Sequence, residues 1–216
     1  MDHRLWTRKN QQMTYKDIDK RKTAFIFELD DVLFPAKDYL YQVYYLFANM
    51  LEFTDLIDAK QATDLMINTY ITEGSANVFD RLKEKLGINE KYRSNLTQLL
   101  ITAKLPLKLL LYKNMLNLLQ EIVIDRKKLF IVTKGDPAQQ LNKIKHTEWN
   151  GLEKYLVVYF ANEINQKPET DVLDMLIKDH SLQRRELLMI GSSDADTLCA
   201  EAGGIDYISA IEFLEP

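Results

Sequence analysis

The chain has 216 residues, 28% of them charged and 46% hydrophobic, and it carries a net charge of -4 with a pI of about 5.5. These values are ordinary for a globular protein, and the lack of a basic stripe argues against nucleic acid as a main partner. No apolar run is long enough to span a membrane, residues 1–22 lack the apolar core of a signal peptide, and the single cysteine excludes an internal disulfide. We therefore expect a cytoplasmic protein without a membrane partner.

The first 22 residues are mostly polar and include seven Lys and Arg side chains. We interpret residues 1–22 as a loosely attached N-terminal extension, and a functional basic arm is the alternative.

The stretch from Ala24 to Phe34 begins with four apolar residues, which suit a central strand of a parallel sheet. It then becomes acidic at Glu28, Asp30 and Asp31. Side chains two positions apart on a strand point the same way, so Glu28 and Asp30 would project together from the strand's carboxyl end, where open α/β sheets bind ligands. The alternative is a strand that ends in a solvated acidic turn.

Residues 37–104 follow a helical pattern almost throughout, with apolar side chains three and four positions apart in four segments. Gly74 and Gly87 stand where helices would end. Because no strand pattern interrupts them, we expect an all-helical unit.

From residue 105 onward, helical and strand patterns alternate. An amphipathic helix is predicted over 107–121, and apolar runs predict strands over 128–133, 155–160, 187–190 and 205–208. This alternation predicts an α/β core, a parallel sheet with helices on both faces, built from residues 23–36 and 105–216.

Polar residues follow these later strands. Thr133, Lys134 and Gly135 stand between a strand and a helix predicted to start near Asp136, where a hydroxyl and free backbone amides make an anion pocket. A Thr at a strand end is common, so this signal alone is weak.

Two further strand ends add charged residues. Lys167 precedes Pro168, which suits the first turn of a helix. A lone lysine is usually solvated, and only its position favours a function. The strand over 187–190 leads into Ser192, Asp194 and Asp196 at the start of another predicted helix.

Four segments, which contain Glu28 and Asp30, Thr133, Lys167, and Asp196, follow strands in this order along the chain. They resemble the four motifs of the haloacid dehalogenase-like (HAD) hydrolase superfamily. The resemblance implies a Rossmann-like core with residues 37–104 as a helical cap, and a Mg²⁺-dependent phosphatase reaction. Glu28 stands at the nucleophile position and Asp30 at that of the general acid and base. Thr133, Lys134, Gly135 and Lys167 would hold the phosphoryl group, and the implied metal ligands are Glu28, Asp30, Asp196, Ser192 and Asp194.

Two residues depart from the family pattern. Glu28 replaces the nucleophilic Asp, and Ser192 replaces a metal-binding Asp that Asp194 would partly substitute. Halide displacement is disfavoured because Asp30 is present, since family dehalogenases lack that Asp. Two functions stay open: a phosphatase for a small phosphorylated metabolite, and a weakened relative that binds a phosphorylated ligand or partner without turnover. We expect a monomer or a weak homodimer.

Overall fold

The computed structural model describes residues 12–214, which divide into two compact units. The first unit contains the described residues up to Pro35, then Leu110–Pro137, and the described residues from Glu148 onward. The second contains Ala36–Leu109 and Ala138–Thr147.

The first unit is built on a five-stranded parallel sheet, as the sequence predicts. Its strands are β1 (Ala24–Phe27), β3 (Lys128–Thr133), β5 (Leu156–Phe160), β6 (Leu187–Gly191) and β7 (Asp206–Ser209), in the order β5-β3-β1-β6-β7. Phe27 is in register with Ile131 of β3 and Ile190 of β6. The residues that follow these strands therefore meet at one edge of the sheet.

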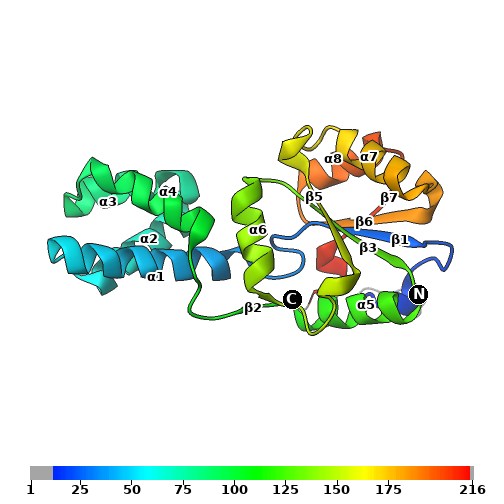
Figure 1. Cartoon of the computed structure of the whole chain (residues 1–216), viewed down its shortest axis with the longest axis horizontal. Coiled ribbons are helices and arrows are strands. Elements are labelled where there is room, and N and C mark those ends of the chain that lie inside the picture. Colours follow the sequence, from blue (N-terminus) through cyan, green and yellow to red (C-terminus); the bar gives the residue numbers. More distant parts are fainter. Residues whose placement is uncertain (1–11, 215–216) are drawn as a thin grey trace, which may run out of the picture. The chain divides into compact units, whose positions relative to one another are not determined.

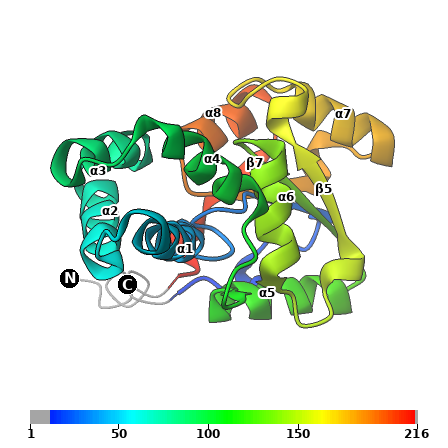
Figure 2. The ribbon, with the colours of Figure 1, turned by 60° about the vertical axis from the view of Figure 1, so that its left-hand side comes forward.

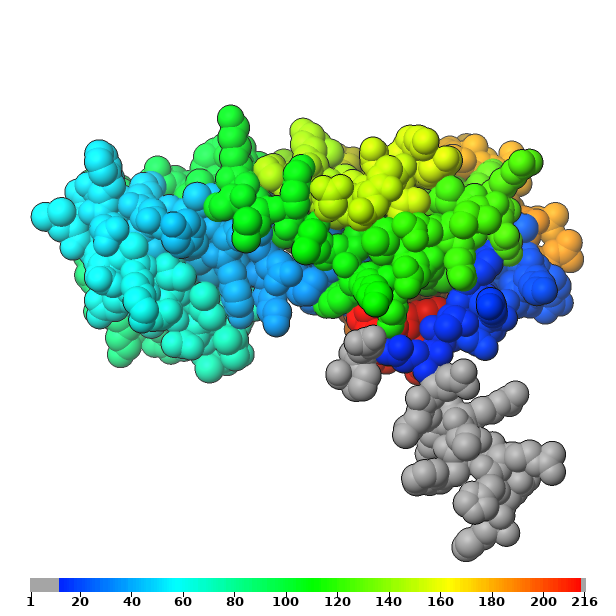
Figure 3. All heavy atoms as spheres, turned by 90° about the horizontal axis from the view of Figure 1, so that it is seen from below, coloured from blue at the N-terminus to red at the C-terminus, as the bar shows by residue number. Residues whose placement is uncertain are grey.

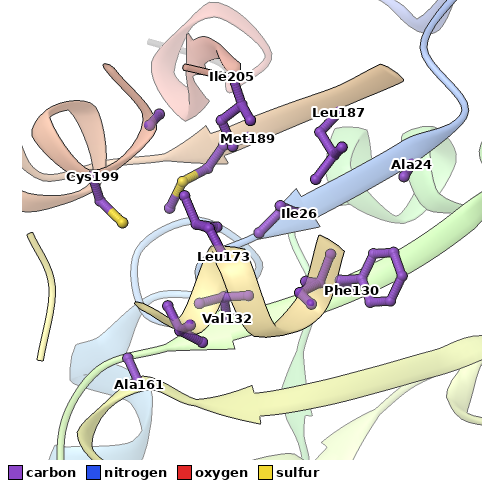
Figure 4. Packing of buried hydrophobic residues seen from close by; sticks show 13 residues of the cluster. Ala24, Ile26, Phe130, Val132, Ala161, Leu173, Leu187, Met189, Cys199 and Ile205 are labelled. Carbon is purple, nitrogen blue, oxygen red and sulfur yellow. The ribbon is translucent and has the colours of Figure 1, made fainter. Parts of the chain in front are cut away.

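Helices cover both faces of this sheet (Figure 1). Alternate strand residues such as Ala24, Ile26 and Met189 pack with helices α7 (Asp171–His180) and α8 (Asp194–Ala202) into one apolar cluster (Figure 4). Helix α5 (Lys113–Ile124) covers the opposite face (Figure 1). All residues of β1 and β6 are buried because they lie between two helical layers.

The second unit is helical, which confirms the predicted helical insertion. It contains α1 (Ala36–Asp55), α2 (Ala59–Glu73), α3 (Val78–Leu86) and α4 (Arg93–Thr102), and α2 and α4 lie beside α1 (Figure 2). Gly87 ends α3 in the left-handed region with a φ of 67°.

Helix α6 (Pro137–His146), apart from its first residue, also belongs to the second unit. The predicted helical unit, residues 37–104, did not include this helix. Asn142 explains the grouping. Its side-chain amide donates to the hydroxyl of Tyr39 at 3.0 Å and to the carbonyl of Ala103 at 3.0 Å. The Tyr39 hydroxyl in turn donates to the carbonyl of Leu100, so α1, α4 and α6 share one polar link.

Residues 12–22 are not loosely attached, so the interpretation of this part of the extension was wrong. Ile18 is buried, the Tyr15 hydroxyl donates to Asp125 at 2.7 Å, and the buried ammonium of Lys22 pairs with Asp206. In Figure 3 this segment, in dark blue, lies beside α5, in green. The rest of the predicted extension, residues 1–11, lies outside the described residues.

Two further details differ from the sequence patterns. The helix predicted over 107–121 starts only at Lys113, because the Tyr112 amide is held by the carbonyl of Leu33 at 2.8 Å in an extended approach. Pro168 belongs to a turn closed by a hydrogen bond from the Glu169 amide to the Gln166 carbonyl, and α7 begins at Asp171.

The remaining elements are short. Strands β2 (Leu109–Leu110) and β4 (Thr147–Glu148) form a second sheet, and 3-10 turns occur at Tyr15–Asp17, Ser75–Asn77, Glu90–Tyr92, Glu153–Tyr155, Ala161–Glu163, Arg184–Glu186 and Ala210–Glu212. Among the described helices, none combines the length and apolar character that crossing a bilayer requires.

The core of the first unit should be sensitive to lost volume. Leu173 of α7 is fully buried in the apolar cluster, so Leu173→Ala should lower the free energy of unfolding by about 2–5 kcal/mol. Leu198 of α8 is 52% exposed, and Leu198→Ala is the matched control, expected within about 0.5 kcal/mol of wild type. Urea unfolding measures both, and equal costs would contradict the described packing.

Candidate functional site

The candidate site starts at Glu28, the first residue after β1. Its backbone amide donates to the carbonyl of Ile190, which still holds it beside β6. The chain then turns: the Leu33 amide donates to the Leu29 carbonyl, and Asp30 forms a backbone bridge with Phe34. Asp30 is half-buried in this turn, two positions beyond Glu28.

The Glu28 carboxylate is buried and accepts four hydrogen bonds. One oxygen accepts from the Thr133 hydroxyl at 2.5 Å and from the Leu29 amide at 2.9 Å. The other accepts from the Lys167 ammonium at 2.5 Å and from the Lys134 amide at 3.3 Å. Three predicted site residues therefore converge on Glu28, two from the end of β3 and one from the loop that follows β5.

Lys167 lies between two carboxylates and has no exposed side-chain surface. Its ammonium donates to Glu28, to Asp196 at 2.6 Å and to the Val132 carbonyl at 3.0 Å, so all three N–H groups have acceptors. Burial alone would lower the pKa of this ammonium, but the charges of Glu28 and Asp196 outweigh burial and raise the pKa above its ordinary value.

Asp196 lies in the first turn of α8 and is fully buried. One of its oxygens accepts from the Ser192 amide at 3.2 Å, the Ser193 amide at 3.1 Å and the Ser193 hydroxyl at 2.8 Å. Burial raises the pKa of Asp196, but the ammonium of Lys167 and the Ser193 hydrogen bonds outweigh it, and the net shift is downward.

Two residues of this network were missed by the sequence reasoning. Ser193 caps α8, and the signal that could have found it is the capping-box spacing of Ser193 and Asp196. Gly191 lets β6 approach Asp196 closely, because a Cβ at Gly191 would lie 2.6 Å from the Cβ of Asp196.

Other predicted site residues are placed differently. The Gly135 amide donates to the side chain of Asn162 at 3.0 Å, and the ammonium of Lys134 donates to the Ser193 hydroxyl at 3.2 Å. Ser192 and Asp194 are exposed. Within the described residues, no hydrogen bond or ion pair joins Asp194 to Glu28, Lys167 or Asp196.

Comparison with known proteins identifies the family. A family model described as haloacid dehalogenase-like hydrolase matches residues 25–210, most of the chain. The chain therefore belongs to the haloacid dehalogenase-like hydrolase family. No curated protein is significantly similar to it in sequence.

Solved structures share the fold at low sequence identity. A predicted phosphoglycolate phosphatase from Haemophilus somnus is 17% identical, with 88% of this chain and 85% of that one covered and a TM-score of 0.58. A subfamily IA hydrolase from Geobacter sulfurreducens is 17% identical, with 88% and 87% covered and a TM-score of 0.52. A hydrolase from Streptococcus pneumoniae is 17% identical, with 87% and 92% covered and a TM-score of 0.52. These likenesses show the fold alone.

The site as arranged does not fit Mg²⁺, the metal that the family generally uses. Mg²⁺ needs carboxylate oxygens with lone pairs directed at it. Glu28 and Asp196 each already accept four hydrogen bonds, about the number that a carboxylate can take. Nowhere among residues 12–214 do three or more His, Cys, Asp or Glu side chains gather as potential metal ligands. We derive no step of a reaction through a metal.

Removing the ammonium should destabilise the first unit. Lys167→Met would leave two buried carboxylates without their counter-ion, at an expected cost of about 3–5 kcal/mol at pH 7. Lys178→Met, on the exposed side of α7, is the control and should stay within about 0.5 kcal/mol of wild type. A Lys167→Met cost below about 1 kcal/mol in chemical denaturation would refute the buried pairing.

The cost of Lys167→Met should also depend on pH. The pKa of Asp196 is lowered in the folded protein, so ionised Asp196 adds to the free energy of unfolding. This stabilisation is complete above the ordinary pKa of about 3.9 and is lost as pH falls through the lowered value. The pKa of Lys167 is raised in the folded protein, so charged Lys167 also adds to the free energy of unfolding. This stabilisation is complete below the ordinary pKa of about 10.4 and is lost as pH rises through the raised value. Urea titrations of wild type and variant should show a constant difference near neutral pH that shrinks in acid. A difference that is constant down to acid unfolding would contradict this linkage.

Proposed function

We propose that the chain is a phosphate-ester hydrolase that acts on a small phosphorylated compound at the carboxyl end of its sheet. One observation carries the proposal: the Thr133 hydroxyl, the Lys134 amide and the Lys167 ammonium converge on the carboxylate of Glu28. Such donors suit the oxygens of a phosphoryl group and the charge that develops during its transfer.

In the proposed reaction, a Glu28 oxygen attacks phosphorus while the bond to the leaving oxygen breaks and Asp30, as the acid, protonates that oxygen. Asp30 then removes a proton from water, which attacks the same phosphorus and breaks its bond to Glu28, releasing phosphate. Lys167 supports Glu28 throughout, and Asp196 holds Lys167 in place.

A second function, binding of a phosphorylated ligand without turnover, is favoured by a different observation. The nucleophile position holds a Glu whose carboxylate is buried and accepts four hydrogen bonds, so few lone pairs are available for attack. Glu28 also carries one methylene more than Asp. A displacement of about 1 Å at a reacting centre can cost roughly 100-fold in rate.

Shortening this side chain separates the two functions. Glu28→Asp should raise kcat/KM for a generic phosphate ester by as much as about 100-fold, because the carboxylate regains the shorter reach of the family nucleophile. The double variant Glu28→Asp with Ser192→Asp, assayed with Mg²⁺ in the buffer, should have a higher kcat/KM than either single variant. The two gains in kcat/KM should not simply add. Asp30→Asn in the Glu28→Asp background should abolish the gain, since it removes the acid. Steady-state kinetics with a panel of phosphate esters compares wild type with the single variants Glu28→Asp, Ser192→Asp and Asp30→Asn and with the two double variants.

Glu201→Asp makes the same chemical change on the exposed side of α8 and should leave the rate at the wild-type level. Wild-type turnover that Asp30→Asn removes supports the hydrolase. Turnover only in the Glu28→Asp variants supports binding without turnover. If every variant folds and none hydrolyses any ester, the phosphate-ester proposal is refuted.

A further inference from the structure

The donors assigned to the phosphoryl group are already in use. The Thr133 hydroxyl and the Lys134 amide at the end of β3, and the Lys167 ammonium beyond β5, all bind the side chain of Glu28. The carboxylate is an oxyanion, as a phosphoryl group is, and its two oxygens divide these donors between them. Glu28 therefore lies where the proposed ligand would bind.

Lys167 has no N–H group left to donate to a second anion, and the Glu28 carboxylate is fully engaged with its donors. Glu28 accepts four hydrogen bonds, and the three N–H groups of Lys167 are taken by Glu28, Asp196 and the Val132 carbonyl. The side chains of Lys167 and Glu28 are 0% and 3% exposed, so water does not screen or replace these contacts. An incoming phosphate must take the hydrogen bonds from Glu28.

We infer that Glu28 is an internal occupant of the phosphoryl pocket, which stays closed to phosphate until the Glu28 carboxylate leaves its donors. The inference rests on the proposed phosphoryl ligand and adds a form of self-inhibition to that site. The side chain makes this possible by its length: it follows β1 directly and still reaches both Thr133 at the end of β3 and Lys167 beyond β5. An Asp is one methylene shorter and would withdraw from the same donors.

The occupancy can be tested by binding without turnover. Calorimetric titration of the full chain with inorganic phosphate, in a phosphate-free buffer with EDTA, compares wild type with Glu28→Ala, Glu28→Gln and Glu201→Ala. Glu28→Ala empties the pocket and should bind phosphate at least about tenfold more tightly than wild type, the factor expected from one charge-assisted hydrogen bond. Glu201→Ala removes an exposed carboxylate elsewhere and should match wild type.

Glu28→Gln separates occupancy from charge. Gln has the shape of Glu without its charge, so it still fills the pocket and should bind phosphate more weakly than Glu28→Ala. Equal affinities of the Gln and Ala variants would assign the effect to charge alone and overturn the inference. Should Glu28→Ala unfold by itself, refolding on addition of phosphate, followed by circular dichroism, would support the occupancy, and no refolding would count against it.

The remaining outcomes separate this inference from the proposed function. If wild type binds phosphate as tightly as Glu28→Ala, the pocket is not closed by Glu28, and the inference fails while the phosphoryl site stands. If folded Glu28→Ala and wild type both fail to bind phosphate, the inference and the phosphoryl site fail together.

Discussion

A buried ammonium between two buried carboxylates is the constraint on which the candidate site depends. Transfer of the Lys167 charge from water into the protein is costly, and only a full set of acceptors makes the buried state tolerable. Those acceptors are Glu28 after β1, Asp196 in α8 and the Val132 carbonyl within β3. One side chain therefore links the end of β1, strand β3 and helix α8, and the geometry of the site cannot be separated from the stability of the fold.

Much of this arrangement could be predicted from the sequence. The strand pattern predicted a parallel sheet, and the residues that follow strands of such a sheet lie at one edge. The structure makes β1 and β3 neighbours, which brings Glu28 and Thr133 together. The prediction that Thr133, Lys167 and Asp196 share one site with Glu28 depended on the family resemblance. Strand patterns could not place Lys167, because it follows a 3-10 turn and a loop after β5.

The rest depends on contacts that no local pattern contains. The Lys134 ammonium reaches Ser193, and the Gly135 amide is taken by Asn162, because loops from different strands meet in space. In the same way, α6 joins the helical unit through the link between Asn142 and Tyr39, which are 103 positions apart. Residues 12–22 pack on the core through contacts with α5, the adjoining Asp125 and β7 that their polar composition does not indicate.

The separations along the chain have a consequence for how the molecule folds. The contact between Lys167 and Glu28 spans 139 positions, and that between Thr133 and Glu28 spans 105. Contacts between residues so far apart in the sequence form late in folding, because the chain loses the entropy of closing a large loop before the contact stabilises it. In a partly folded chain these charged groups would still be hydrated. A spectroscopic probe beside Lys167 would therefore report the arrival of the complete native sheet, whereas a probe within α1 would report local helix formation.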